Sequence, residues 1–543
     1  MKHSTMKKSA VLVAAALVAA SCSSENSALD AGNDDTPGPT ESAATEPDTT
    51  ADPTTDTVGD ADDGETGDTA PSVTETTEGS DTTVDSATTE PATTEPGPTT
   101  TVAPLADLPP CPVDALDAAD GPVELTFWYG LGNELETALL DVVAEYNASQ
   151  DRVVVDAQNQ ISYEAIVDKY IQSGESGRPD IVQLPEYTVQ SFAQSDTFVP
   201  VEACSDASGF DLGEILPRAL SAYVFEGVQW ALPFNVSNPV LYYNRTMFAE
   251  AGLTDDDSPV SLEELRSVSQ QLVDSGAAAT GIALDSSRDS GGAWFLEQWF
   301  GRAGQPYADN DNGRTAPATK VLFNSEFGVE LFTYLQDLVA DGLAVTVGDN
   351  AGGQDAFLKM IDETAPAAMT MGTSAALSSV LALLSGGIAP GFVADDLGVG
   401  PMPGPGDEPA AQVGGASLWI PAGKSDEATA AAWDFITYMV DAQTQSTWAA
   451  RTGYVPVRAD ALELDPIRTT YAEDPRFRVA YDQLLAADDG STSALPALGP
   501  HREVRAETAD AIASVYAGAD VAATLAEAEA AANALIENYN ARN

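Results

Sequence analysis

The chain has 543 residues, and its 85 acidic side chains against 23 Lys and Arg give a formal net charge of -62 at pH 7. A surface this acidic disfavours nucleic acids and anionic lipid surfaces as partners, although it says little about a small ligand in a cleft. Because only 21 of the acidic residues lie between positions 23 and 108, most of the excess charge belongs to the rest of the chain.

The first 21 residues have the layout of a bacterial signal peptide. Three lysines at the start are followed by 11 apolar residues, 10–20. A stretch of this length is too short to span a bilayer, so we expect the segment to be cleaved. Cys22 comes directly after two small residues and resembles the lipobox cysteine of bacterial lipoproteins, although Ala19 stands where Leu is usual. We therefore predict a lipid anchor at Cys22 on the outer face of the cell membrane. The alternative is a secreted protein with an incidental thiol.

Residues 22–108 have the composition of a tether. They consist mostly of Thr, Asp, Glu, Pro, Ser and Ala and contain almost no aromatic residues. Such a segment cannot bury enough apolar surface to offset the entropy of folding, so we predict that it is disordered. Its acidic side chains repel one another and its prolines stiffen it. We expect it to hold a folded body away from the membrane.

The remaining cysteines, Cys111 and Cys204, form an even pair if Cys22 carries a lipid. In an exported protein such a pair favours a disulfide, and two buried free thiols are the alternative. The histidine, cysteine and acidic residues show no metal-ligand spacing, and the mature chain keeps one histidine, His501. We therefore expect no metal site and no cofactor.

The body, residues 109–543, is too long for one compact core and suits two lobes. Its first part alternates apolar strand patterns with amphipathic helix patterns. The order strand, helix, strand, helix, strand predicts a parallel sheet covered by helices, as in an α/β fold. The segments, in chain order, are 123–129, 135–146, 152–157, 163–173 and 180–184.

Later segments are mostly helical. Ser261 and Glu264 have the spacing of a capping box, and Gly342 and Gly453 have the positions of glycines that end helices. We expect helices at 261–273, 327–342 and 426–450, and strands at 240–243 and 416–421. Strands separated by long helical insertions predict two α/β lobes that the chain crosses more than once. The Gly- and Pro-rich residues 400–409 are expected to form a loop between the lobes.

Five blocks of the body carry a resemblance to known proteins. They are FWYGLGNELETALLDVVAEYNAS (127–149), SYEAIVDKY (162–170), PFNVSNPVLYYN (233–244), GGASLWIPAGKS (414–425) and RTGYVPV (451–457). Each block alone is weak evidence, but together they span almost the whole body in the right order. They resemble the extracellular solute-binding proteins of carbohydrate-type ABC importers (family 1). Within that family the chain is most similar to binding proteins for glycerol 3-phosphate and glycerophosphodiesters.

The resemblance implies a two-lobe periplasmic-binding-protein fold of the class II type, in which crossing hinge segments let the lobes close on one ligand. Lobe one would contain about residues 109–234 and 363–420, and lobe two about 235–362 and 421–543. A ligand that contacts both lobes stabilises the closed state. The chain would then be a binding protein and not an enzyme. It would act as a monomer that delivers its ligand to the permease subunits of an ABC transporter.

The family's ligand contacts fall on seven positions of this chain: Tyr163, Glu186, Ser237, Ser374, Gly415, Tyr454 and Arg505. Tyr163 and Glu186 would bind the hydroxyl groups of a polyol; the alternative is that Tyr163 only begins a helix and Glu186 only caps one. Ser374 would lie at a helix N-terminus, whose amides and dipole attract an anion, and Gly415 would offer a backbone amide. Arg505 matches the arginine that holds the phosphate, since a guanidinium grips a phosphate with two parallel donors.

One position departs from the family pattern and leaves the ligand open. Where a tryptophan covers the ligand in enterobacterial members, this chain has Arg302, and Trp299 one turn earlier would cover the site instead. A second cation would suit a phosphate, whereas a changed wall would admit a larger headgroup or a different sugar, such as a maltose-type oligosaccharide. Trp128, Trp294 and Trp419 are candidates for stacking on sugar faces, although aromatic residues in such runs more often belong to the core.

Two other classes of function are weaker alternatives. A cell-surface glycoside hydrolase would use two of the many carboxylates, whose separation in space a sequence does not give. A structural adhesin would suit the acidic tether. Against an enzyme, the sequence contains no nucleophile elbow, metal motif or P-loop, and the turn at 130–132 lacks the third glycine of a dinucleotide fingerprint.

Overall fold

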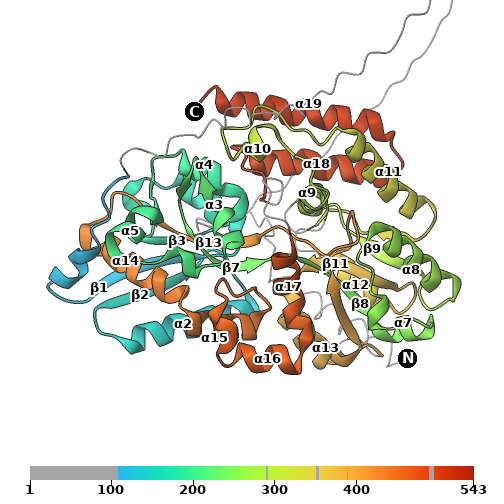
Figure 1. The fold of residues 1–543 in the computed structure, drawn as a ribbon, viewed down its shortest axis with the longest axis horizontal. Helices are drawn as coiled ribbons and strands as arrows, with labels where there is room; N and C mark the ends of the chain where they lie inside the picture. The colour runs from blue at the N-terminus through green and yellow to red at the C-terminus, as the bar shows by residue number, and fades with distance from the viewer. Residues whose placement is uncertain (1–107, 289–290, 350–353, 388, 390, 488–493) are drawn as a thin grey trace, which may run out of the picture. The chain divides into compact units, whose positions relative to one another are not determined.

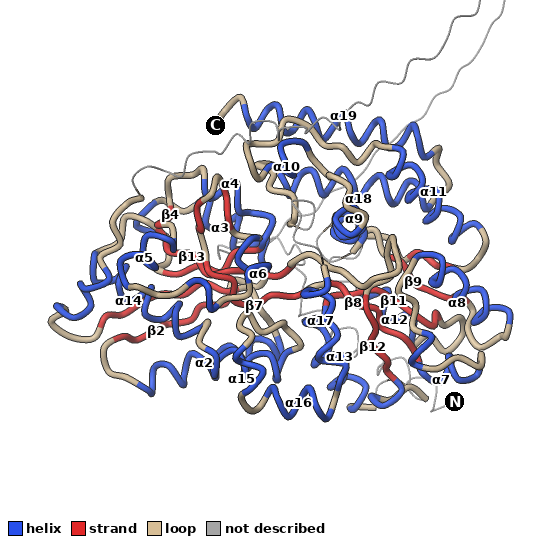
Figure 2. The backbone as a smooth tube through the Cα atoms, viewed as in Figure 1, coloured by secondary structure: helices blue, strands red, loops and turns tan. Residues whose placement is uncertain are grey.

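The computed structural model describes residues 108–288, 291–349, 354–387, 389, 391–487 and 494–543. The predicted signal peptide, Cys22 and the predicted tether up to residue 107 lie outside this part of the chain. Within the described residues the strands form two large sheets and one two-stranded hairpin, β5 (Val224–Phe225) with β6 (Val228–Gln229). Figure 1 shows the two large sheets with helices around them, and Figure 2 shows the same arrangement with the strands in red.

The first sheet has the strand order β2-β1-β3-β13-β4, with β7 paired to β13. Its strands are β1 (Val123–Tyr129), β2 (Val153–Asn159), β3 (Ile181–Pro185), β4 (Phe198–Val199), β7 (Leu232–Ser237) and β13 (Gly414–Pro421). Strands β1, β2 and β3 are parallel and are joined through helices α2 (Asn133–Ser149) and α3 (Tyr163–Gln172). The predicted parallel α/β arrangement of this part is confirmed. Strand β13 runs antiparallel to its three neighbours.

The second sheet has the order β10-β9-β11-β8-β12. Its strands are β8 (Pro239–Asn244), β9 (Thr280–Leu284), β10 (Ala344–Thr346), β11 (Ala367–Thr373) and β12 (Leu397–Pro401). Strand β8 lies between β11 and β12 and is antiparallel to both. This pairing corrects the expected assignment of residues 363–420 to lobe one. Strands β11 and β12 of that segment hydrogen-bond to β8 in the second sheet, and only β13 belongs to the first.

The helices after β13 are divided between the two sheets. Helices α14 (Asp426–Met439) and α15 (Ala442–Thr452) pack on α2 of the first sheet. Helices α18 (His501–Tyr516) and α19 (Val521–Asn540) pack on each other and on α11 (Glu326–Ala340), at the upper right in Figure 1. Helix α18 also packs on α9 (Gly292–Arg302). Residues 421–543 therefore contribute to both lobes, and not to lobe two alone as expected.

The expected helix at 426–450 is two helices, α14 and α15. Apolar periodicity continues through the junction, but the side chain of Asp441 accepts hydrogen bonds from the amides of Gln443 and Thr444 and so begins a new helix. The expected end at Gly453 is confirmed, with φ 103° at that glycine. The capping box of Ser261 and Glu264 is also present, at the start of α8 (Leu262–Asp274). The remaining helices are α4 (Val189–Ala193), α5 (Val201–Ser208), α6 (Pro217–Ser221), α7 (Arg245–Glu250), α10 (Asp309–Gly313), α12 (Gln354–Met360), α13 (Leu377–Ser385), α16 (Ile467–Glu473) and α17 (Val479–Ala486).

The chain first crosses between the sheets at Asn238, directly between β7 and β8. The side chain of Asn238 donates to the carbonyl of Ala480 at 2.8 Å and accepts from Gln483 Nε2 at 2.6 Å. Gln483 Nε2 also lies 2.6 Å from the carbonyl of Pro239. Helix α17 therefore stabilises this crossing through these hydrogen bonds. The second crossing is the segment 402–413 between β12 and β13. It includes residues 402–409 of the expected loop, whereas Gly400 and Pro401 belong to β12.

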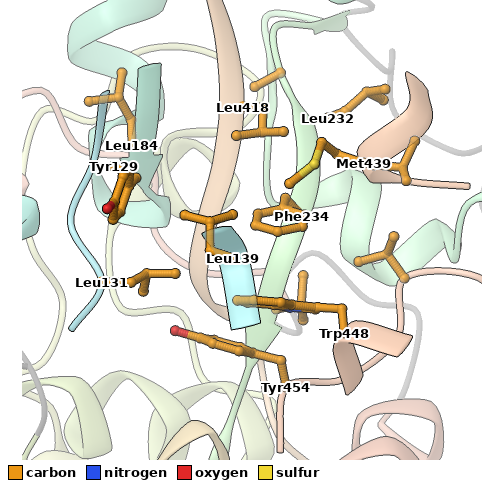
Figure 3. Close-up of a cluster of buried hydrophobic side chains, with 14 of the residues drawn as sticks. Tyr129, Leu131, Leu139, Leu184, Leu232, Phe234, Leu418, Met439, Trp448 and Tyr454 are labelled. Carbon is orange, nitrogen blue, oxygen red and sulfur yellow. The ribbon is translucent and has the colours of Figure 1, made fainter. Parts of the chain in front are cut away.

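A buried aromatic stack connects the core of the first lobe to the phenol of Tyr454. Phe234 of β7 stacks on Trp448 of α15 with ring centroids 4.9 Å apart, and Trp448 stacks on Tyr454 at 5.5 Å. Figure 3 shows these rings among leucines of α2, β3 and β13. Trp448 is fully buried, so its packing fixes the position of Tyr454.

A disulfide joins Cys111 to Cys204 of α5, as predicted. It ties the segment that precedes β1 to the first lobe, where Leu116 of the same segment is also buried. Among the described residues, no helix combines the length and the apolar composition that a membrane crossing requires.

Candidate functional site

Polar groups gather at the carboxyl ends of the parallel strands in the first sheet. Gly130 follows β1, Tyr163 comes after β2 at the start of α3, and Glu186 follows β3. The carboxyl ends of parallel strands share one edge of the sheet, which is where open α/β sheets bind ligands. Local capping positions Tyr163, because the hydroxyl of Ser162 accepts from the amide of Ala165 and begins α3 at this point.

A chain of hydrogen bonds orients the phenol of Tyr163. The amide of Gly130 donates to Gln183 Oε1 at 2.9 Å, and Gln183 Nε2 donates to Asn235 Oδ1 at 2.9 Å. Asn235 Nδ2 then donates to the hydroxyl of Tyr163 at 2.7 Å. The hydroxyl of Tyr454 lies 3.5 Å from that of Tyr163. The predicted residues Tyr163 and Tyr454 are therefore neighbours, and Gln183 and Asn235 hold Tyr163 in place.

Arg505 of α18 connects the two lobes through a buried charge cluster. Its Nη2 donates to Glu186 Oε1 of the first lobe at 3.0 Å and to Glu297 Oε2 of α9 at 2.7 Å, and its Nε donates to Glu297 Oε1 at 2.8 Å. His501 Nε2 lies 2.9 Å from Glu297 Oε1. Arg505 and Glu297 are fully buried, and the ring of Tyr187 lies 5.0 Å from the guanidinium. The structure thus brings the predicted pair Glu186 and Arg505 together and adds Glu297 and His501.

The two carboxyl groups of the cluster have different pKa values because different numbers of hydrogen-bond donors face them. Burial raises the pKa of Glu186 to about 7, against the opposing charge of Arg505. Burial also favours the neutral form of Glu297, but Arg505 and His501 together hold the pKa of Glu297 at about 2. Burial lowers the pKa of His501, so the imidazole is neutral near pH 7. The ionised Glu297 only accepts hydrogen bonds, so His501 Nε2 carries the proton between them.

The predicted residues Ser237, Ser374 and Gly415 lie at the crossing between the sheets. The amide of Ser374 donates to the carbonyl of Asn238 at 2.9 Å, which fixes the start of the helical turn at 374–376. Ser237 is the last residue of β7 and is buried beside Gly414. Gly415 has φ 94°, and a Cβ at this position would lie 2.1 Å from the carbonyl oxygen of Asn235. Only glycine allows β13 to approach β7 this closely.

The expected ligand wall, Trp299 and Arg302, contacts the second crossing. Trp299 is buried, and its indole nitrogen donates to the carbonyl of Pro403 at 2.8 Å. Arg302 donates to the carbonyls of Met402, Val260 and Gly406 at 2.6, 2.9 and 3.1 Å. Both side chains therefore hold the segment 402–406 in position. Their part in binding a ligand stays a prediction.

The three other candidate tryptophans differ in their surroundings. Trp419 is fully buried between Phe192 and Phe198 and belongs to the core. Trp128 lies under the ammonium group of Lys169, 3.9 Å from the ring centroid. Trp294 packs so closely on the first residue of β13 that a Cβ at that glycine would lie 2.4 Å from the indole. Among the three, Trp294 is the one placed against the crossing between the lobes.

Four residues of the site, Glu297, His501, Gln183 and Asn235, were not predicted from the sequence. Glu297 had a detectable signal, because it is an acidic residue within the apolar run 293–300 of a buried helix, and a buried carboxylate requires a charged or hydrogen-bonding partner. His501 lies four residues before Arg505 on the same helix, a spacing that places both on one face. Gln183 and Asn235 lie in strands whose other residues are mostly apolar, so single buried amides of this kind indicate a polar network. In the described part of the chain, no three His, Cys, Asp or Glu side chains gather in a way that would hold a metal ion.

Comparison with known proteins identifies the family of this fold. Residues 141–479 match the family described as bacterial extracellular solute-binding protein, and the chain belongs to this family. The family acts outside the cytoplasm. The chain is 27% identical to the sn-glycerol-3-phosphate-binding periplasmic protein UgpB of Yersinia pestis over 371 residues, which cover 67% of this chain and 80% of that protein. It is 25% identical to the protein of the same name from Salmonella typhimurium over 403 residues, 73% of this chain and 88% of the relative.

Solved structures have the same fold. UgpB from Mycobacterium tuberculosis in complex with glycerophosphocholine is 21% identical, with a TM-score of 0.62, and the match covers 77% of this chain and 99% of that one. The cyclic alpha-maltosyl-1,6-maltose binding protein from Arthrobacter globiformis is 25% identical with a TM-score of 0.63, over 77% of this chain and all of the other. The similar proteins named here are solute-binding proteins rather than enzymes, and both phosphate-containing and sugar ligands occur in their names.

Proposed function

We propose that this chain captures a small hydroxylated solute, a polyol phosphate or a sugar, and delivers it unchanged to an ABC import permease. The contact between Glu186 of the first lobe and Arg505 of α18 carries the proposal, because it places polar groups from both lobes at one point. The glycerol-3-phosphate-binding relatives support the first ligand class. The maltose-type binding protein of Arthrobacter supports the second, an oligosaccharide.

Seven predicted residues take part in this proposal, and Arg505 would hold the phosphate of a polyol phosphate. Tyr163 and Glu186 bind ligand hydroxyls, with Tyr454 beside Tyr163. Ser237, Ser374 and the amide of Gly415 bind from the crossing, which is a point that both lobes share. A ligand that reaches the groups of both lobes stabilises the closed state, and the permease would recognise this state.

The proposal includes the location of the protein. A cleaved signal peptide and a lipid on Cys22 would hold a monomeric binding protein at the outer face of the membrane. The acidic segment up to residue 108 would give the body reach to collect ligand and return to the permease. Labelling with a radioactive fatty acid tests this part, since Cys22→Ser should abolish incorporation of the label and release the protein into the medium.

Thermal-shift measurements test the binding function. A ligand that binds only the native state raises the melting temperature by mass action, and a concentration of 100 Kd stabilises by about 2.7 kcal/mol. The panel would contain glycerol 3-phosphate, glycerophosphocholine, maltose and glycerol. Saturable stabilisation by one member without turnover is the expected result. Hydrolysis of a panel member would contradict the binding-only role, and no shift with any of them would contradict the ligand classes named here.

A further inference from the structure

We infer that Tyr223 is a further ligand-binding residue of this protein, whose phenol donates a hydrogen bond to an oxygen of the captured solute. The inference rests on the proposed function, because it adds a contact to the same site. Two observations carry it. The hydroxyl group of Tyr223 is buried and has no hydrogen-bond partner among the described residues, and the chain around Tyr223 packs on the helix that follows Glu186.

The phenol of Tyr223 is a buried donor without an acceptor. The residue is 0% exposed, and burial raises its pKa well above the usual value, so the phenol keeps its proton. The hydroxyl of Ser417 acts on the same pKa, but its own hydrogen bonds join it to Trp419 Nε1 at 2.9 Å and to the carbonyl of Leu184 at 3.4 Å. A buried hydroxyl without a partner costs free energy, and folded proteins satisfy nearly all such groups. A ligand oxygen would supply the missing acceptor.

The elements around Tyr223 place its phenol at the candidate site. Strand β5 begins directly after Tyr223 and packs on α4, and α4 follows the turn that begins at Glu186. Ser417 of β13 pairs with Leu184, two residues before Glu186. Glu186 and Tyr454, which are both predicted ligand residues, act on the pKa of Tyr223 electrostatically. The unpaired hydroxyl group therefore lies among the groups that are proposed to contact the ligand.

The backbone around Tyr223 is held on both sides. Arg314 donates to the carbonyls of Ala222 and Val224 at 3.1 and 2.9 Å, and the carbonyl of Tyr223 accepts from the amide of Trp230 at 3.1 Å. Packing on all sides also restricts the ring, since the residue is fully buried. The donor is thus fixed before a ligand arrives, and a hydrogen bond from it costs little ordering entropy.

Tyr471 of α16 provides a matched control. Its hydroxyl group is also buried without a hydrogen-bond partner among the described residues, and the side chain lies in the same hydrophobic core as Tyr223. Besides burial, the groups that act on its pKa are Tyr481, Asp482 and Arg478, none of which is a predicted ligand residue. The two tyrosines therefore share their chemistry and burial and differ in their distance from the predicted site.

Replacing Tyr223 with phenylalanine removes the hydroxyl group alone. Calorimetric titration with glycerol 3-phosphate, glycerophosphocholine, maltose and glycerol identifies a ligand of the wild-type protein. We expect Tyr223→Phe to bind that ligand at least about fivefold more weakly, because an oxygen of the ligand loses its donor. The urea midpoint of the variant should be no lower than that of the wild type, because the hydroxyl group makes no hydrogen bond within the described protein. Tyr471→Phe should leave the affinity unchanged.

The outcomes separate this inference from the function on which it rests. Equal affinities of Tyr223→Phe and the wild type would overturn the inference and leave the solute-binding function standing. An equal loss of affinity in Tyr471→Phe would also overturn it, because the loss would then come from the core. A lower urea midpoint, or a Tyr223→Phe variant that does not fold, would show that the hydroxyl group has a partner within the protein and would contradict the inference. No binding of any compound by the wild type would overturn both.

Discussion

Replacing Arg505 with alanine tests the buried charge cluster. The change leaves Glu186, 6% exposed, and Glu297, 0% exposed, without the guanidinium that they share. Removing one partner of a buried ion pair costs roughly 3–5 kcal/mol, because the other charge stays buried and uncompensated. His501 remains on Glu297, so we expect a value at the lower end, about 3 kcal/mol of unfolding free energy at pH 8.

The cost should depend on pH in a definite direction. Without Arg505, burial raises the pKa of both carboxyl groups above their values in the unfolded chain. A carboxyl group with a raised pKa stabilises the fold below its unfolded pKa and loses this contribution as the pH rises through its folded pKa. The deficit of Arg505→Ala relative to the wild type should therefore shrink between pH 8 and pH 5, by about 1.4 kcal/mol for each unit of pKa change.

Urea denaturation followed by tryptophan fluorescence at pH 5, 6.5 and 8 measures both effects. Arg502→Ala is the matched control on the same helix, because Arg502 pairs with Asp168 where the two side chains are 29% and 52% exposed. Exposed pairs of this kind contribute less than about 1 kcal/mol. A loss below about 1 kcal/mol for Arg505→Ala at pH 8, or an equal loss at pH 5, would refute the description of a buried, shared guanidinium.

Three further predictions concern single features. Because the pKa of Glu186 is raised to about 7, its contribution to stability is present below its unfolded pKa and is lost as the pH rises through 7. Glu186→Gln should therefore flatten the pH dependence of the urea midpoint between pH 5 and 8. An unchanged slope would show that Glu186 does not titrate there. The double variant Cys111→Ser, Cys204→Ser removes a disulfide between residues 93 positions apart. The unfolded chain then gains entropy, so the free energy of unfolding, measured by urea denaturation, should fall by about 4–5 kcal/mol. An unchanged urea midpoint would argue against the bond. Gly415→Ala should lower the free energy of unfolding by at least about 2 kcal/mol, because the alanine would be strained at this φ and its Cβ would meet the carbonyl oxygen of Asn235. Gly406→Ala is the control and should cost about 1 kcal/mol, because Gly406 has a similar φ but open space around it. Equal losses for the two variants would exclude the close approach at Gly415.

The fold was predictable wherever local pattern decides it. Alternating apolar strands and amphipathic helices in residues 123–185 indicated the parallel part of the first sheet, because each element shows its own period. The partners of β11 and β12 were not predictable in this way. An apolar strand such as Ala367–Thr373 has the same composition whichever sheet it joins, and its hydrogen bonds to β8 depend on residues more than a hundred positions away.

The site was predictable only where a family resemblance supplied the residues. Tyr163 lies in one of the blocks that resemble the family, whereas Glu186 and Arg505 lie outside the blocks and were predicted from the family's ligand contacts; the structure places Glu186 against Arg505. Glu297 carries no spacing pattern with Arg505, since α9 and α18 lie about 200 residues apart in sequence and meet only through packing. His501 precedes Arg505 by four residues on α18, a spacing that places both on one face of the helix. A search for such pairs can start from the sequence, because each charged residue within a buried apolar helix requires a charged or hydrogen-bonding partner.

The bond between Cys111 and Cys204 determines where a mechanical load on the N-terminal chain enters the body. Tension applied at Leu108 reaches the covalent link after three residues, before it reaches β1. The disulfide transmits the force to α5, so the segment between Cys111 and Val123 carries no tension while the bond is intact. The hydrogen bonds of β1 to β2 and β3 are thereby shielded from force, and a body pulled by its N-terminus keeps its first sheet in register, with the predicted binding residues in place.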